Sequence, residues 1–186
     1  MRGGLVIGIP LSLLQYGLHQ HTGGTVDAWS VANNFALCSA IYDADRLPDD
    51  ASWQTRLPTR VAALGSTGFY ASNPLTVPLV PVVVLLHAAY KPLKHELKAL
   101  KPFFIALCWT TAVYYVPELR ANAVDNDLLT PLSFFLSISA LSHAADVVDR
   151  DEDAAAGIQT LAVTASTRQE AEYVAWLLLC AATVLH

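Results

Sequence analysis

The stretch that decides the fold is "LSFFLSISALSHAADVVDRDEDAAAGIQTL", residues 132–161. Its first half is apolar and is typical of a membrane-spanning helix, whereas four aspartates and one glutamate lie between Asp146 and Asp153. Ionised carboxylates next to hydrocarbon are costly unless a positive partner neutralises them. The sequence therefore predicts a membrane helix that ends at an acidic site with a cationic partner.

The composition of the whole chain supports a membrane protein. Of its 186 residues, 54% are apolar and 15% are charged, whereas a soluble domain usually carries about 25% charged residues. Apolar runs that approach the length of a spanning helix, about 20 residues, recur along the chain, and we find no nucleic-acid signature. We predict an all-α polytopic membrane protein, a single helical domain over 1–186 surrounded by lipid, with spans at 4–20, 27–43, 74–90, 102–118, 128–145 and 170–185.

The basic residues constrain how the chain crosses the membrane. Short loops on the inner face collect Lys and Arg, yet six strictly alternating crossings would divide the 11 basic residues almost equally between the two faces. If residues 61–90 instead enter the membrane and return, only Arg120 lies opposite the other basic residues. We therefore predict a short or re-entrant third helix at about 61–72, followed by the full span at 74–90.

Two clusters of acidic residues end two of the predicted spans. Asp146, Asp149 and Asp153 share one face if the preceding helix continues through them. Asp45 and Asp49 are four residues apart at the end of the second span. Mg²⁺ takes oxygen ligands and is commonly shared between one or two carboxylates and a substrate phosphate. The spacing alone leaves two interpretations open: solvated acidic loops, or two metal sites that hold a diphosphate between them.

The acidic cluster at 146–153, the second one along the chain, resembles a known motif. The stretch "DVVDRDEDAAAGIQTLAV" (146–163) is similar to the second aspartate-rich motif of the UbiA superfamily of intramembrane prenyltransferases, roughly Asp-x-x-Asp-x-x-x-Asp-x-x-x-Gly-Ile-x-Thr-Leu. The first motif of that family matches less well, because Ile41 and Tyr42 stand at its Asn-Asp positions and "IYDADRLPD" (41–49) is closer to a branch with Tyr-x-x-Asp-Arg. Every fixed position of the second motif is present: Asp146, Asp149, Asp153, Gly157, Ile158, Thr160 and Leu161.

The resemblance implies a helical bundle with a magnesium-dependent site for a prenyl diphosphate. The stretch "YKPLKHELKALKPFFIALCWT" (90–110) resembles the family's loop between its fourth and fifth helices, so Tyr90 and Lys94 are the implied catalytic residues. Positive-inside anchoring is an equally good explanation for Lys91, Lys98 and Lys101. The implied metal ligands are Asp45, Asp49, Asp146, Asp149 and Asp153, and the implied substrate-binding residues are Tyr42, Arg46 and Arg150.

Two functions are compatible with the resemblance. An active member would transfer a prenyl group to an aromatic or lipid acceptor, with neighbouring subunits completing the helix wall; the intact second motif favours this interpretation. The family has nine helices around a lateral cavity, whereas this sequence ends one helix after the second motif. A truncated, non-catalytic structural subunit of a photosynthetic or respiratory membrane complex, with bound lipid, quinone or pigment, is the alternative. The bacterial inner membrane, the mitochondrial inner membrane and the plastid thylakoid all remain open as locations.

Overall fold

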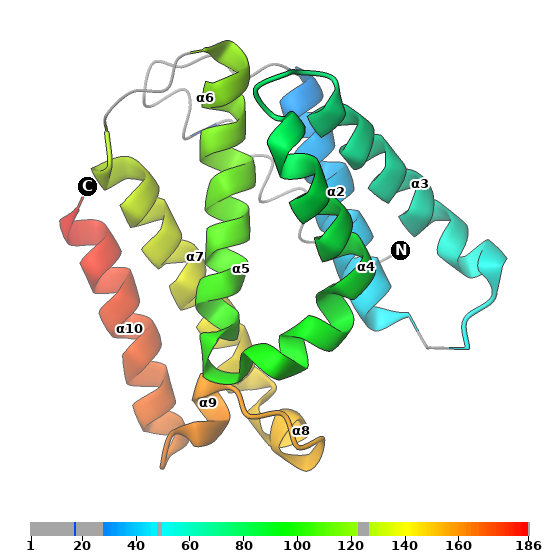
Figure 1. Cartoon of the computed structure of the whole chain (residues 1–186). Helices are drawn as coiled ribbons and strands as arrows, with labels where there is room; N and C mark the ends of the chain where they lie inside the picture. Colours follow the sequence, from blue (N-terminus) through cyan, green and yellow to red (C-terminus); the bar gives the residue numbers. More distant parts are fainter. Residues whose placement is uncertain (1–16, 18–27, 48–49, 123–126, 186) are drawn as a thin grey trace. The chain divides into compact units, whose positions relative to one another are not determined.

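A computed structural model describes residues 17, 28–47, 50–122 and 127–185, with only the backbone described for 42, 44–46, 90–91 and 94–95. Every regular element in these ranges is helical, which confirms the predicted all-α class (Figure 1). The predicted first span at 4–20 lies outside the described residues except for Gly17.

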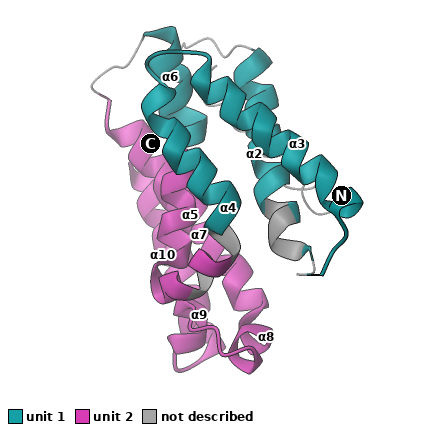
Figure 2. Ribbon diagram, turned by 45° about the vertical axis from the view of Figure 1, so that its right-hand side comes forward, with its two compact units in different colours: residues 1–91, 112–124 teal, residues 92–111, 125–186 magenta. Residues whose placement is uncertain are grey.

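The chain forms two compact units, coloured separately in Figure 2. Unit 1 comprises residues 1–91 and 112–124, and unit 2 comprises residues 92–111 and 125–186. Helix α4 (Val80–Leu97) and the continuous helical stretch that begins with α5 (Lys101–Thr110) contribute residues to both units. The single domain over 1–186 stays a prediction.

Helices α2 (Ala28–Arg46) and α3 (Trp53–Ala71) pack together in unit 1. The prediction of a short third helix at about 61–72 is wrong, because α3 begins at Trp53 and has 19 residues, which corresponds to about 28 Å. Ser52 caps its start, since its Oγ accepts a hydrogen bond from the Thr55 N–H at 3.3 Å. Pro58 lies inside the helix, in its second turn, where it removes one backbone hydrogen bond.

The chain reverses its direction between α3 and α4, through the short 3₁₀ helix η1 (Val77–Leu79) (Figure 1). The buried Thr76 hydroxyl stabilises this turn by donating to the Tyr70 carbonyl at 2.7 Å. Asn73 Oδ1 also accepts from the Leu75 N–H at 2.9 Å. The turn is thus specified by side-chain hydrogen bonds to the backbone, as is common for Asn and Thr.

A long helical stretch follows α4. It runs from η2 (Lys98–Leu100) through α5 and the π-helical segment η3 (Thr111–Tyr115) to α6 (Val116–Ala121). Lys98 has a φ of 48°, which marks the break between α4 and α5 because a non-glycine residue seldom adopts this conformation. In the π segment, the Ala112 carbonyl accepts from Asn34 Nδ2 at 3.3 Å. A side chain of α2 therefore satisfies a backbone group that the irregular segment leaves available.

Helix α7 (Leu129–Val148) lies between α5 and α10 (Arg168–Val184) in unit 2 (Figure 1). The rings of Phe103 and Phe135 stack with centroids 6.4 Å apart, which joins α5 to α7. Ser133 Oγ donates to the Ala182 carbonyl at 2.9 Å and joins α7 to α10. Two short helices, α8 (Arg150–Ala155) and α9 (Leu161–Thr164), connect α7 to α10 at the end that carries the acidic motif.

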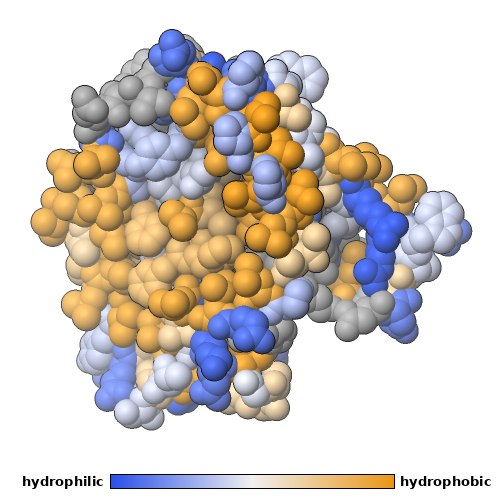
Figure 3. All heavy atoms as spheres, viewed as in Figure 1, coloured by the Kyte–Doolittle hydropathy of each residue, from blue (hydrophilic) through white to orange (hydrophobic). Residues whose placement is uncertain are grey.

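Two helical stretches of the described residues, Lys98–Ala121 and Leu129–Val148, are long and apolar enough to cross a membrane. They coincide closely with the predicted spans at 102–118 and 128–145, which makes these two runs candidate spans by length and composition. The six full spans stay a prediction. On the face shown in Figure 3, apolar side chains cover much of α7 and α10. The exposed apolar residues of these two helices include Leu132, Leu141, Val148, Trp176, Leu177 and Val184.

Candidate acidic site at the end of α7

The second acidic cluster follows a nearly helical path that bends at Asp149. Helix α7 ends at Val148 and α8 begins at Arg150, while Asp149 has φ −87° and ψ 6°. The hydrogen-bond ladder continues through the bend, since the Asp153 N–H donates to the Asp149 carbonyl at 2.8 Å. Asp146 is only 3% exposed, Asp153 is half-buried and Asp149 is exposed. The structure therefore turns Asp146 and Asp153 inward and leaves Asp149 at the surface.

Lys101 is the positive partner of Asp146. Its Nζ lies 2.5 Å from Asp146 Oδ1, and the two side chains are 18% and 4% exposed. A buried carboxylate is strongly unfavourable without such a partner. From the sequence, Lys101 was interpreted only as one of several lysines that could anchor the chain at the membrane surface. The one available signal was its position at the start of the apolar run that packs against the helix carrying Asp146.

Two carboxylate oxygens of the cluster have no hydrogen-bond partner among the described residues. Asp146 Oδ2 and Asp153 Oδ2 are both buried, and Asp153 is close enough to Asp146 to repel it electrostatically. Buried polar atoms nearly always have a partner, so these oxygens suit a cation.

The donor set of this cluster fits one type of metal site. In the part of the chain that the structure describes, no group of three or more potential metal ligands comes together. Two carboxylates are too few for a closed protein cage, but they suit Mg²⁺, which retains waters and shares its remaining positions with phosphate oxygens.

His143 packs α7 against α10, one turn before Asp146. Its ring is fully buried, and Nε2 lies 2.8 Å from the Ala171 carbonyl. Because a carbonyl oxygen can only accept, Nε2 carries the proton in this hydrogen bond. His143 therefore contributes to the packing of α7 against α10.

The remaining motif residues shape the connection between α8 and α10. Gly157 has a φ of 73°, a conformation that favours glycine, and its N–H donates to the Ala154 carbonyl at 3.1 Å to end α8. Thr160 is fully buried, and its Oγ1 caps α9 by accepting from the Val163 N–H at 3.3 Å. The glycine and threonine of the motif are therefore explained by backbone geometry.

Arg150 holds α9 in place. Its Nε donates to the Ala162 carbonyl at 3.0 Å, and its Nη2 donates to the Ala165 carbonyl at 3.1 Å. Beside these contacts, Val147 packs with Ala162 and Ala171 in a small core cluster. Two donors of Arg150 thus serve the fold, and a role in binding substrate stays a prediction.

The first acidic cluster belongs to unit 1. Helix α2 ends at Arg46, which places Asp45 at the end of a helix as predicted. Asp49 lies outside the described residues. The expectation that the first cluster and the loop residues meet the second cluster around one diphosphate stays a prediction, because the side chains of Tyr42, Asp45, Arg46, Tyr90 and Lys94 are not among those described.

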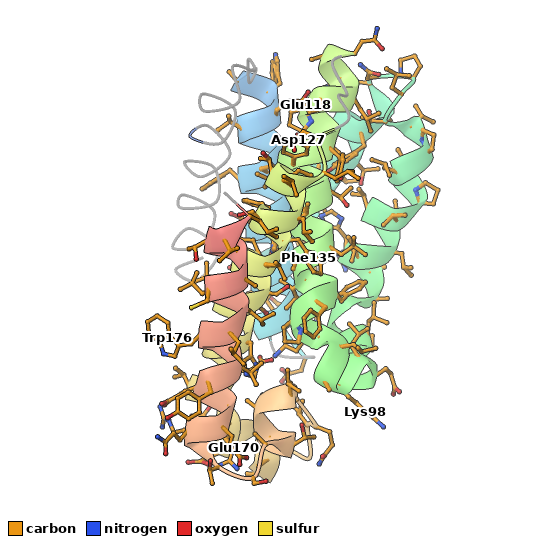
Figure 4. All side chains as sticks on the ribbon, turned by 90° about the vertical axis from the view of Figure 1, so that its left-hand side faces the viewer. Lys98, Glu118, Asp127, Phe135, Glu170 and Trp176 are labelled. Atoms are coloured by element: carbon orange, nitrogen blue, oxygen red, sulfur yellow. The ribbon has the colours of Figure 1, made fainter. Side chains whose placement is uncertain are left out.

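An apolar groove of about 270 Å³ runs between α7 and α10. It is lined by small residues such as Ala144 and Ala175, and Trp176 projects from α10 beside it (Figure 4). At the end where Glu170 lies, the ion pair of Arg168 Nε with Glu172 Oε1, at 3.2 Å, borders the groove. The groove belongs to the apolar face of unit 2, and neither Asp146 nor Asp153 lines it.

The all-helical fold and the two helices that are long and apolar enough to cross a membrane agree with an integral membrane protein. The chain belongs to the UbiA prenyltransferase family, because residues 59–186 match that family. The matched residues include Lys101 and the second acidic cluster, whereas Asp45 and Asp49 precede them. No curated protein and no solved structure matches the sequence significantly.

Proposed function

We propose that this chain binds a prenyl diphosphate together with Mg²⁺ at the end of α7 and transfers the prenyl group to an aromatic or lipid acceptor. The observation that carries this proposal is the pair of buried carboxylate oxygens, Asp146 Oδ2 and Asp153 Oδ2, that have no protein partner among the described residues. Membership of the UbiA prenyltransferase family supports the same reaction class.

Each residue of the site would have a distinct role. Asp146 and Asp153 would hold the cation, and exposed Asp149 would add an oxygen from the solvent side. Bound Mg²⁺ would supply Lewis-acid stabilisation of the departing pyrophosphate. The Lys101 ammonium would add a charged donor at the same place, where fixed charges stabilise developing negative charge most strongly.

The transfer itself is a substitution at the allylic carbon. The bond between this carbon and the diphosphate oxygen breaks, and pyrophosphate leaves with the electron pair. The nucleophilic atom of the acceptor forms the new bond and loses its proton to solvent. Tyr90 and Lys94 would contact the diphosphate, Asp45 and Asp49 would hold a second metal ion, and Tyr42, Arg46 and Arg150 would contact the substrate; these roles rest on the family resemblance.

One observation favours a second candidate function, a non-catalytic subunit of a larger membrane complex. Asp146 already has a cationic partner in Lys101, and the described side chains include no cluster of three metal ligands. In that case the ion pair would be a packing element, and the apolar face of unit 2 would contact other subunits, lipid, quinone or pigment.

Release of pyrophosphate distinguishes the two functions. The full-length chain in lipid nanodiscs is supplied with geranylgeranyl diphosphate, an aromatic acceptor and Mg²⁺, and released pyrophosphate is measured with and without chelator. Asp153→Asn should reduce the rate by about 100-fold, the order of loss expected when a group that stabilises the transition state is removed. Asp151→Asn is the matched control, because it removes the same charge from an exposed neighbour on α8 and should leave the rate unchanged. Equal rates in the two variants, or release that is insensitive to chelator, would contradict the proposal.

A further inference from the structure

We propose that Lys101 is a built-in counter-cation of the acidic site, which a divalent metal ion displaces from Asp146 and which then binds the diphosphate. This inference rests on the proposed function and concerns the order in which cations occupy the site. It assigns to Lys101 a role that neither the motif nor the loop resemblance contains.

The burial of Asp146 requires a positive partner whenever its carboxylate is ionised. The carboxylate is almost completely excluded from solvent, and its Oδ1 is bound by Lys101 Nζ at 2.5 Å, whereas its Oδ2 has no described partner. An ionised group in such a position is retained only when it is paired. In the absence of metal, Lys101 provides this pairing.

Lys101 can leave Asp146 without any change in the helices. Its ammonium is at the end of a flexible four-carbon chain, and its side chain is 18% exposed, so a path to solvent is available. The backbone at this point is fixed independently, because Lys101 is the first residue of α5 and the stacked rings of Phe103 and Phe135 join α5 to α7. Asp146 has no comparable freedom, since it is buried within the last turn of α7.

A divalent ion bound to the unpartnered oxygens of Asp146 and Asp153 would make the contact of the Lys101 ammonium with Asp146 unfavourable. Bound to Asp146 Oδ2 and Asp153 Oδ2, it would place two positive charges within a few ångströms of Lys101 Nζ, and like charges at this range repel strongly in a poorly solvated site. A diphosphate that arrives with the metal carries negative charge, so it would attract the released ammonium, which can donate three hydrogen bonds. The same lysine would thus oppose bare metal and favour the metal–diphosphate complex.

Opposite effects on two binding constants test this inference. Lys101→Met in the full-length chain should bind Mn²⁺ alone about tenfold more tightly, and Mn²⁺ with inorganic pyrophosphate about tenfold more weakly, than the parent chain. Electron paramagnetic resonance of free and bound Mn²⁺ in nanodiscs measures both constants. Lys98→Met is the matched control, because it removes the same charge from an exposed side chain three residues earlier. Both of its constants should stay within about twofold of the parent values, since exposed charges are screened by salt.

A second measurement uses the unaltered protein and does not depend on the stability of Lys101→Met. Acetylation of lysines by a water-soluble reagent, followed by mass spectrometry, should show that Mg²⁺ increases the reactivity of Lys101 and that added pyrophosphate decreases it again. Lys98 should react equally in all three conditions.

Three results would overturn the inference. Weaker or unchanged Mn²⁺ binding by Lys101→Met, while the parent binds Mn²⁺ well, would reject the exchange of cations and leave the proposed function intact. Reactivity of Lys101 that does not respond to Mg²⁺ would do the same. If neither the parent nor the variant binds Mn²⁺, with or without pyrophosphate, the metal site of the proposed function is rejected as well.

Discussion

Lys101 Nζ and Asp146 Oδ1 lie 2.5 Å apart although 45 residues separate them in the sequence. The contact joins the first turn of α5 to the last turn of α7 and occupies a carboxylate that is almost fully buried. It explains how a chain with so many acidic residues next to an apolar helix can fold, and it makes the stability of the protein sensitive to a single lysine.

Removal of this lysine should therefore destabilise the fold. We expect Lys101→Met to lower the free energy of unfolding by about 3 kcal/mol, the lower end of the range for breaking a buried ion pair, because an uncompensated carboxylate remains. The double variant Lys101→Met/Asp146→Asn should recover most of the loss, since it leaves no buried charge. Thermal unfolding in detergent measures both changes. Equal destabilisation of the single and double variants would mean that packing of the lysine chain, and not its charge, stabilises the site.

At Gly157 there is room for a methyl group, but the backbone conformation is unfavourable for any residue with a side chain. A Cβ at this position would meet no atom within 4 Å, yet the residue has a φ of 73°. Gly157→Ala should then cost about 1–2 kcal/mol, the penalty for a left-handed conformation. Gly65→Ala on α3 is the control, since its Cβ also has open space and its φ is ordinary; it should stabilise the helix by up to about 1 kcal/mol. Opposite shifts of the melting temperature are expected, and a loss in both variants would argue against the backbone explanation.

Arg150 should stabilise the helix α9 against local opening. A lysine cannot reproduce the two donors that reach the Ala162 and Ala165 carbonyls, so Arg150→Lys should increase amide hydrogen exchange across 160–166. Mass spectrometry of exchanged peptides measures the effect, with Arg168→Lys as a control because Arg168 is exposed and pairs with Glu172 of its own helix. Unchanged exchange together with weaker pyrophosphate binding would support the substrate-binding role that the resemblance assigned to Arg150.

The start of α7 should depend on pH through Asp127. Hydrogen bonds from the Thr130 side chain and the Leu129 N–H lower the pKa of Asp127 below its ordinary value of 3.8. Because the folded-state pKa is the lower one, its contribution to stability is present above pH 3.8 and is lost as the pH falls through the folded-state pKa. Asp127→Asn retains an acceptor but does not titrate, so the difference in melting temperature between parent and variant should shrink in this acidic range. A constant difference would show that the charge of Asp127 does not stabilise the helix.

Hydropathy was sufficient to locate the two most apolar helices. The runs at 102–118 and 128–145 are long enough that their helical state follows from local composition. The third helix could not be placed in this way, because five of its first eight residues are polar and the helicity of this segment depends on the Ser52 cap and on packing against α2.

The same distinction applies to the site. The acidic residues were visible as a spaced pattern, and the apolar run before them predicted a helix that ends at this cluster. The pairing of Asp146 with Lys101 was not predictable, since it depends on how α5 packs against α7, and no local pattern connects residues so far apart.

The ion pair also affects how members of the family are classified as active or inactive from their motifs. A complete set of aspartates in this motif does not by itself mean that each one is available to a ligand, because a distant lysine can already occupy it. Surveys that sort relatives by the acidic residues alone would miss this partner, and the residue at the start of α5, which precedes the motif in the sequence, would have to be inspected with them.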